Sequence, residues 1–162
     1  MTDDALTIRE ATDADVPALV AVLRAAFAEQ RDLAPPSSAL GETEESVRGL
    51  MHTARVALAV VDGRIVGSQF FEPKDDYLYL FRLAVLPDHR QRGIGQALIR
   101  YAEEQARALG LPRTQFSVRL ALPRQRAMYE RMGYRFVEYG THSGFSAPTF
   151  ATLTKDLDPP PN

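Results

Sequence analysis

The sequence predicts an α/β (α+β) domain in which strands and helices follow one another along most of the chain. Three observations lead to this class. Several short apolar runs have the length and composition of strands, and other segments repeat apolar residues at the spacing of one helix face. Glycine, proline and aspartate separate these segments at positions typical of turns. The length of 162 residues suits one well-buried domain and is short for two ordinary ones.

The first half of the chain is expected to hold two helices and four strands. Thr12, followed by acidic residues, is typical of a helix N-cap, and apolar residues then recur at helical spacing to about Ala28. A prolyl loop comes next, and then a short helix from about Glu42 to His52. Asp62-Gly63 is a two-residue turn of the kind that closes a β-hairpin. The expected strands cover residues 6–10, 56–61, 65–71 and 77–86.

The second half is expected to add two helices and three strands. One helix runs from Gln96 to about Leu109, where Gly110 is placed as a C-terminal cap. Pro123 is suited to the first turn of the next helix, which continues to Met132. The expected strands cover residues 114–120, 134–140 and 149–157. Residues 1–158 are therefore expected to form a single domain, and residues 159–162 a disordered tail.

Composition excludes several classes of function. The formal net charge of −2 gives no broad attraction to nucleic acid, although 17 of the 19 basic residues are arginine. The chain has no cysteine, and its three histidines lack the spacing of metal ligands, so we expect neither a thiol nucleophile nor a metal. No apolar run approaches the roughly twenty residues that cross a bilayer, and the acidic first residues do not resemble a signal peptide. A cytoplasmic protein is expected.

A glycine-bearing segment between an expected strand and an expected helix is the strongest functional signal. Arg90-Gln91-Arg92-Gly93-Ile94-Gly95 follows the strand that ends at Leu86, and free amide groups at a helix start can bind a diphosphate. A Walker-type loop would need Lys and Ser or Thr after the last glycine, where Gln96 and Ala97 stand. A dinucleotide fingerprint would need a third small residue, where Leu98 stands. The segment therefore indicates a different nucleotide-like cofactor.

The remaining pattern, Arg/Gln-x-x-Gly-x-Gly/Ala after Leu83-Ala84-Val85, resembles the acyl-CoA loop of the GNAT superfamily of N-acetyltransferases. A second segment, Ala127 to Tyr134, resembles the later "LYEKxGF" stretch of that family. The resemblance covers nearly the whole chain, from Ile8 to Tyr134. It implies a mixed, mostly antiparallel, twisted sheet of six to seven strands, flanked by about four helices. Strands 4 and 5 of that sheet would splay around the acyl-CoA.

The resemblance also assigns roles to residues. Tyr129 would be the catalytic acid that assists departure of the thiolate, and Gln125, one helical turn away, would line the cofactor site. The backbone of the expected fourth strand would pair with the pantetheine arm, and the loop would hold the pyrophosphate. The implied cofactor-binding residues are Leu83, Ala84, Val85, Arg90, Gln91, Arg92, Gly93, Ile94, Gly95, Gln96 and Gln125.

Two positions depart from the family pattern. Leu122 stands where many relatives have an asparagine that touches the cofactor arm, and Tyr79 and Phe81 stand where many have a Glu or His as general base. No strong base is visible in the sequence. Weak candidates are Glu29, Glu72, His142 and the hydroxyl of Tyr79. Aromatic residues that would suit an apolar or cationic acceptor are Phe27, Tyr79, Phe81 and Phe145.

The resemblance implies transfer of an acetyl group from acetyl-CoA to a primary amine of a small molecule or peptide, by direct attack in a ternary complex. Two alternatives stay open at this point. The missing asparagine and base favour an acyl-CoA-binding sensor or interaction module with little turnover, and the acceptor could instead be a protein N-terminus or lysine side chain. Nucleic acid and membrane partners are not expected, and a homodimer is possible through the last two strands.

Overall fold

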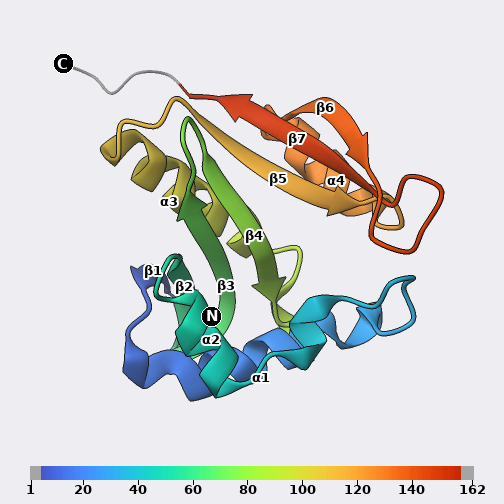
Figure 1. Cartoon of the computed structure of the whole chain (residues 1–162). Helices are drawn as coiled ribbons and strands as arrows, with labels where there is room; N and C mark the ends of the chain where they lie inside the picture. Colours follow the sequence, from blue (N-terminus) through green and yellow to red (C-terminus); the bar gives the residue numbers. More distant parts are fainter. Residues whose placement is uncertain (1–4, 158–162) are drawn as a thin grey trace. The chain divides into compact units, whose positions relative to one another are not determined.

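The computed structural model describes residues 5–157 of the chain (Figure 1). Within these residues it contains seven strands and four α-helices, joined by turns and short 3₁₀ segments. The strands are β1 (Leu6–Glu10), β2 (Arg55–Val61), β3 (Arg64–Pro73), β4 (Leu78–Val85), β5 (Arg113–Arg119), β6 (Arg135–Gly140) and β7 (Phe150–Asp156). The helices are α1 (Val16–Phe27), α2 (Glu44–Leu50), α3 (Ile94–Ala108) and α4 (Pro123–Arg131).

The strands follow the order β1-β2-β3-β4-β5-β7-β6 in one seven-stranded sheet. β1 with β2, β2 with β3, β5 with β7 and β6 with β7 are antiparallel, whereas β4 with β5 is parallel. The prediction of a mixed, mostly antiparallel sheet with four helices is therefore confirmed. Contacts divide the chain into two compact units, with β4 and α3 each contributing to both. The first unit comprises the residues up to Glu72 and Arg82–Ala102, and the second comprises Pro73–Phe81 and the residues from Glu103 on.

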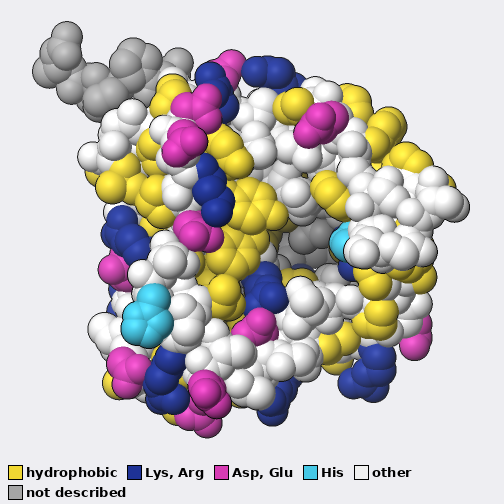
Figure 2. Space-filling view, viewed as in Figure 1, with side chains coloured by type: hydrophobic (Ala, Val, Ile, Leu, Met, Phe, Trp, Pro, Cys, Tyr) yellow, Lys and Arg dark blue, Asp and Glu magenta, His cyan; other side chains and the backbone are white. Residues whose placement is uncertain are grey.

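The first unit packs α1, α2 and the start of α3 with β1, β2, β3 and the end of β4. Asp62 and Gly63 both have positive φ, 51° and 76°, as the predicted hairpin turn requires. Figure 2 shows acidic and basic side chains interspersed over the α1 and α2 segments. The largest fully buried apolar side chains of this unit are Val16, Leu19, Leu23, Leu58, Phe70, Phe71, Leu98 and Ile99.

The second unit packs α4 on the strands β5, β7 and β6. Phe116 of β5 stacks on Tyr129 of α4, with ring centroids 4.3 Å apart. A buried polar network lies beside this stack. The Tyr134 hydroxyl donates to Glu103 at 2.9 Å, and Lys155 Nζ lies 3.1 Å from the same carboxylate oxygen. The buried Glu103 charge is therefore paired.

Most predicted boundaries agree with the structure to within one or two residues, and the differences have local causes. α3 begins at Ile94, two residues before the expected Gln96, because Gly93 with φ +80° ends the loop. α2 begins at Glu44 because Thr43 caps it and accepts a hydrogen bond from the Ser46 amide at 3.1 Å.

Two expectations on chain organisation stay untested. The single domain over residues 1–158 stays a prediction, and the expected tail at residues 159–162 lies outside the described residues. Among the helices of residues 5–157, none is long and apolar enough to span a bilayer.

Candidate functional site

The segment between β4 and α3 forms a loop with two left-handed residues. β4 ends at Val85, and the Leu86 amide donates to the Val66 carbonyl at 2.9 Å, which fixes the start of the loop on β3. Gln91 has φ 63° and Gly93 has φ 80°, so the chain turns twice before α3 begins at Ile94. This is the strand, turn and helix start that the sequence predicts.

The loop presents unpaired backbone amides at the start of a helix. Ala97 makes the first helical hydrogen bond, to the Gly93 carbonyl at 3.0 Å. The backbone N–H groups of residues 91–96 find no hydrogen-bond acceptor among the described residues. The dipole of α3 adds roughly half a positive charge at this end. Amides and dipole together make a site for an anion, and successive amides suit a diphosphate.

The two glycines of the loop have different roles. Gly93 has open space where a Cβ would stand, so its positive φ is the feature that favours glycine. Gly95 is helical, and a Cβ there would lie 3.7 Å from Leu83 and 3.9 Å from Val85. A side chain as small as alanine would therefore make ordinary contacts with the end of β4 at position 95.

Arg90 and Arg92 differ in their surroundings. Arg90 Nε donates to the Val85 carbonyl at 3.1 Å, its Nη2 donates to the Ala26 carbonyl at 3.0 Å, and its Nη1 pairs with Glu29. Arg90 thus fastens the loop to the ends of β4 and α1. Arg92 is exposed, and no described residue forms an ion pair with it. Arg92 is the side chain of the loop that is available to a phosphate.

The end of β4 differs from its beginning. The register with β5 is described for residues 78–80, which pair with residues 114–116. Arg82 then has φ 54°, a left-handed conformation that is uncommon within a strand. The predicted cofactor-binding residues follow it. Ala84 is buried, while Leu83 and Val85 are half-buried.

In the second unit, α4 places the predicted acid. Tyr129 is 3% exposed and hydrogen-bonds to Gln125, so the two residues that helical spacing put on one face do contact each other. Burial raises the pKa of the Tyr129 phenol well above its ordinary 10, and the hydrogen bond to Gln125 lowers it by less. The phenol is therefore protonated near neutral pH and can donate a hydrogen bond or a proton. Leu122, at the N-cap of α4, gives no side-chain cap.

The predicted aromatic residues do not all gather in one place. Tyr79 and Phe81 of β4 stack, with ring centroids 5.6 Å apart and an interplanar angle of 14°. Phe145 is exposed in the loop between β6 and β7. Phe27 is buried in α1 and belongs to the other unit. The structure thus brings together one aromatic pair of the four residues.

The candidate bases fall into different environments. Glu29 is engaged by Arg90, and Glu72 is half-buried. His142 shares a hydrogen bond with the Thr149 hydroxyl through Nδ1, and burial followed by the charge of Arg119 lowers its pKa. A neutral imidazole could accept a proton, but His142 lies on the loop after β6 with no described link to the other predicted residues. No group of three acidic or histidine side chains suited to a metal occurs among residues 5–157.

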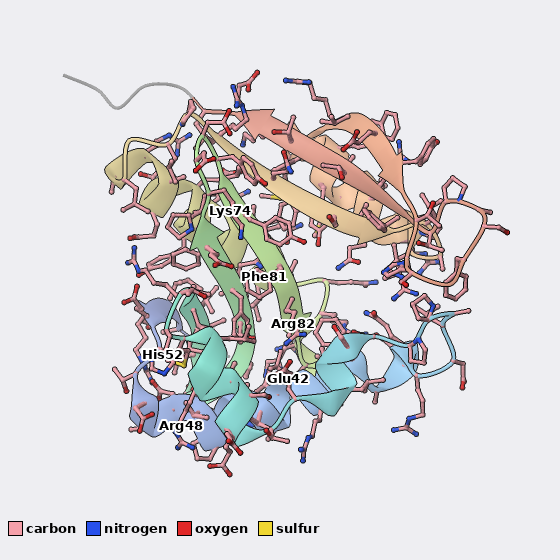
Figure 3. The ribbon with its side chains drawn as sticks, in the orientation of Figure 1. Glu42, Arg48, His52, Lys74, Phe81 and Arg82 are labelled. Carbon is pink, nitrogen blue, oxygen red and sulfur yellow. The ribbon has the colours of Figure 1, made fainter. Side chains whose placement is uncertain are left out.

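The first unit also holds one charged cluster that was not predicted from the sequence. Arg82 and Glu42 form an ion pair in which the Glu42 carboxylate is buried (Figure 3). The sequence contained one signal, because Arg82 lies at the two-residue spacing that places Leu78, Leu80 and Ala84 on one face of the strand. Its partner, 40 residues earlier in the chain, had no signal.

Comparison with known proteins identifies the family and the fold. A sequence model of the acetyltransferase (GNAT) family matches residues 20–134, most of the chain. The chain belongs to the GNAT family. An uncharacterized N-acetyltransferase of Bacillus pumilus is 36% identical to it over 87 residues, which make up 53% of this chain and 48% of that relative. The GNAT chain thus spans about half the length of the curated relatives it matches.

Solved structures agree with this fold. The PaiA N-acetyltransferase of Thermoplasma acidophilum, in complex with coenzyme A, superimposes with a TM-score of 0.78 at 16% identity, covering 94% of this GNAT chain and 99% of that one. A GNAT family acetyltransferase of Elizabethkingia anophelis with acetyl-CoA bound gives 0.71 at 18% identity, with coverages of 96% and 100%. At these identities the similarity establishes the fold of the GNAT chain alone.

Proposed function

We propose that the chain is an acetyl-CoA-dependent N-acetyltransferase that transfers an acetyl group to the primary amine of a small molecule or peptide. The observation that carries this proposal is the row of unpaired amides at residues 91–96, placed at the start of α3 in a member of the GNAT family. Two proteins of the same fold, at low identity, contain coenzyme A or acetyl-CoA. The cytoplasmic location stays a prediction.

The loop residues hold the cofactor in this proposal. The amides of residues 91–96 bind the pyrophosphate, and Arg92 adds a charge-assisted contact. Arg90 keeps the loop in place through Val85 and Ala26, since its donors are already engaged there. The backbone at Leu83–Val85 pairs with the pantetheine arm as an added strand would. Bound acetyl-CoA supplies the acyl group as a thioester.

Tyr129 supplies the acid. The amine nitrogen of the acceptor forms a bond to the thioester carbonyl carbon, the carbon–sulfur bond breaks, and the leaving thiolate receives a proton. Tyr129 donates that proton or a hydrogen bond to the sulfur, because a phenol is protonated at neutral pH. Burial raises the pKa of Tyr129 further, which favours the hydrogen bond over full proton transfer. The proton lost by the ammonium of the acceptor goes to water or to a base that the sequence does not mark. Orientation of the two reactants by the backbone contributes the remaining rate enhancement.

A second candidate function is an acyl-CoA-binding sensor with little turnover. Leu122 favours it, because an apolar side chain occupies the position where many relatives contact the cofactor arm through asparagine. Tyr79 and Phe81 also favour it, because these stacked rings stand where many relatives carry a base. Transfer to a protein N-terminus or lysine is a variant of the main proposal that differs in the acceptor.

Release of free CoA thiol, measured with acetyl-CoA and a panel of small amines, antibiotics and peptides, separates these functions. The native protein is expected to release thiol with at least one acceptor, and Tyr129→Phe is expected to release much less. Tyr139→Phe is the matched control, because Tyr139 is exposed on β6. Acetyl-CoA binding without acceptor-dependent thiol release would favour the sensor, and absence of acetyl-CoA binding would refute both functions.

A further inference from the structure

The left-handed residue of β4 carries a charge where the strand is otherwise apolar. Leu78, Leu80, Ala84 and Leu86 are buried, and Arg82 stands in phase with them at the two-residue period of a strand. An unpaired charge at such a position would be costly. The φ of 54° at Arg82 is also unfavourable for a residue with a Cβ, so other interactions must hold it.

A buried carboxylate from the segment before α2 supplies those interactions. Glu42 is 8% exposed and pairs with Nη1 of Arg82 through Oε1. Its Oε2 accepts from the Ser46 hydroxyl at 2.5 Å, and Nη2 of Arg82 donates to the Ser38 hydroxyl at 3.0 Å. Arg24 donates to the Glu42 carbonyl at 2.9 Å. Figure 3 shows the Arg82 and Glu42 side chains pointing toward each other.

The residues that follow Arg82 are held at their far end by β3 and by Arg90, whose Nε donates to the Val85 carbonyl at 3.1 Å. The Leu86 amide donates to the Val66 carbonyl, and Ala84 O would lie 2.8 Å from a Cβ on Gly67, so the two backbones approach closely there. The direction in which the strand enters this contact is set at Arg82. A change of φ at Arg82 would therefore turn the main-chain groups of Leu83.

We propose that the Arg82–Glu42 ion pair is a positioning pair that holds the left-handed bend of β4 and so orients the backbone of Leu83–Val85 toward acyl-CoA. The inference rests on the proposed function, because it takes these residues as the ones that pair with the cofactor arm. Neither side chain touches the cofactor in this inference. The pair acts by keeping most molecules in the conformation that binds.

The contrast between glycine and alanine at position 82 tests this role. Glycine adopts a positive φ without a steric cost and alanine does not, although both remove the guanidinium. Both variants carry Glu42→Gln, so that neither leaves a buried carboxylate without a counter-charge. Arg48→Ala is the control. Arg48 lies in the neighbouring helix α2 and forms an exposed ion pair with Asp13 at 2.9 Å. Coenzyme A affinity is measured by calorimetry, and folding by circular dichroism.

The expected order of affinities is specific to a positioning role. Glu42→Gln with Arg82→Gly should bind coenzyme A within about threefold of the native protein, and Glu42→Gln with Arg82→Ala should bind about tenfold more weakly than the glycine variant. Arg48→Ala should bind as the native protein does. An equal loss in the glycine and alanine variants would overturn the inference, because the guanidinium itself would then contact the ligand. No loss in either would also overturn it, because the pair would then only stabilise the fold.

A measurement on the free protein covers the case in which the alanine variant does not fold. Glu42→Ala keeps Arg82 and removes its partner, so the ¹³C chemical shifts of Arg82 should leave the left-handed range. Shifts that stay in that range would overturn the inference. Failure of the native protein to bind coenzyme A would instead refute the proposed function, and it is seen before any variant is compared.

Discussion

Alanine replacements at Gly95 and at Gly93 should separate stability from cofactor binding. Gly95 is helical without a positive φ, and the added Cβ would make ordinary contacts with Leu83 and Val85 at 3.7 and 3.9 Å. Alanine is more favourable than glycine in a helix by about 0.5–1 kcal/mol. For a chain of 162 residues this raises the melting temperature by about 1–4 °C. The free protein should therefore be at least as stable as the native one.

Binding of coenzyme A should be native in Gly95→Ala, because the acyl-CoA loop pattern has glycine or alanine at this position. Gly93→Ala should weaken binding, because Gly93 has φ 80° and this conformation costs a residue with a Cβ about 1–2 kcal/mol. Restoring the native loop to bind the ligand would then weaken the affinity by about 5- to 30-fold. Calorimetry with coenzyme A measures the affinity, and thermal unfolding measures the stability.

Gly49→Ala is the matched control. Gly49 lies in α2 with nothing within 4 Å of an added Cβ, so its replacement should raise stability in the same way and leave the affinity unchanged. Native affinity for coenzyme A in the Gly93→Ala protein would refute the placement of the phosphate site at this loop.

Three further changes test other parts of the structure. Tyr129→Phe should lower kcat by about 10²- to 10⁴-fold. Because burial raises the pKa of Tyr129, the kcat of the native protein should not fall through ionisation of this residue below about pH 10. A pH–rate profile of both proteins measures these two effects. Asp15→Asn should lower stability by up to about 1 kcal/mol at pH 7, because Arg9, 2.8 Å away, lowers the pKa of Asp15. A carboxyl group whose pKa is lowered by folding stabilises the folded state at pH values above its unfolded pKa. The difference in unfolding free energy between the native protein and Asp15→Asn, measured in urea, should therefore be full above about pH 5 and shrink as the pH falls. Gly67→Ala should destabilise the chain by about 1–3 kcal/mol in urea unfolding, since its Cβ would lie 2.8 Å from the Ala84 carbonyl oxygen; unchanged stability would contradict the close approach of β3 and β4.

The sequence predicted what depends on neighbouring residues. The Asp62-Gly63 turn, the helix stop at Gly110 and the loop before α3 are set by local conformational preferences, and the structure confirms them. The contact of Gln125 with Tyr129 follows from helical spacing alone. These features need no knowledge of which segments meet in space.

The sequence did not predict contacts between distant segments. Arg90 pairs with Glu29, 61 residues away, so a side chain assigned to a phosphate is also a structural link between the loop and α1. Glu42 and Arg82 lie 40 residues apart, and the bend that they accompany depends on a backbone angle that no turn motif marks. The acceptor is unpredicted for a related reason, because specificity depends on loops that vary on a fixed scaffold.

Titration calorimetry of the native chain with acetyl-CoA tests the central claim most directly. Saturable binding of one molecule per chain, weakened about fivefold or more in Gly93→Ala and unchanged in Gly95→Ala and Gly49→Ala, is the result that the amide row at residues 91–96 predicts. Absence of heat at protein and ligand concentrations suited to micromolar affinity, confirmed by an independent binding assay, would contradict it.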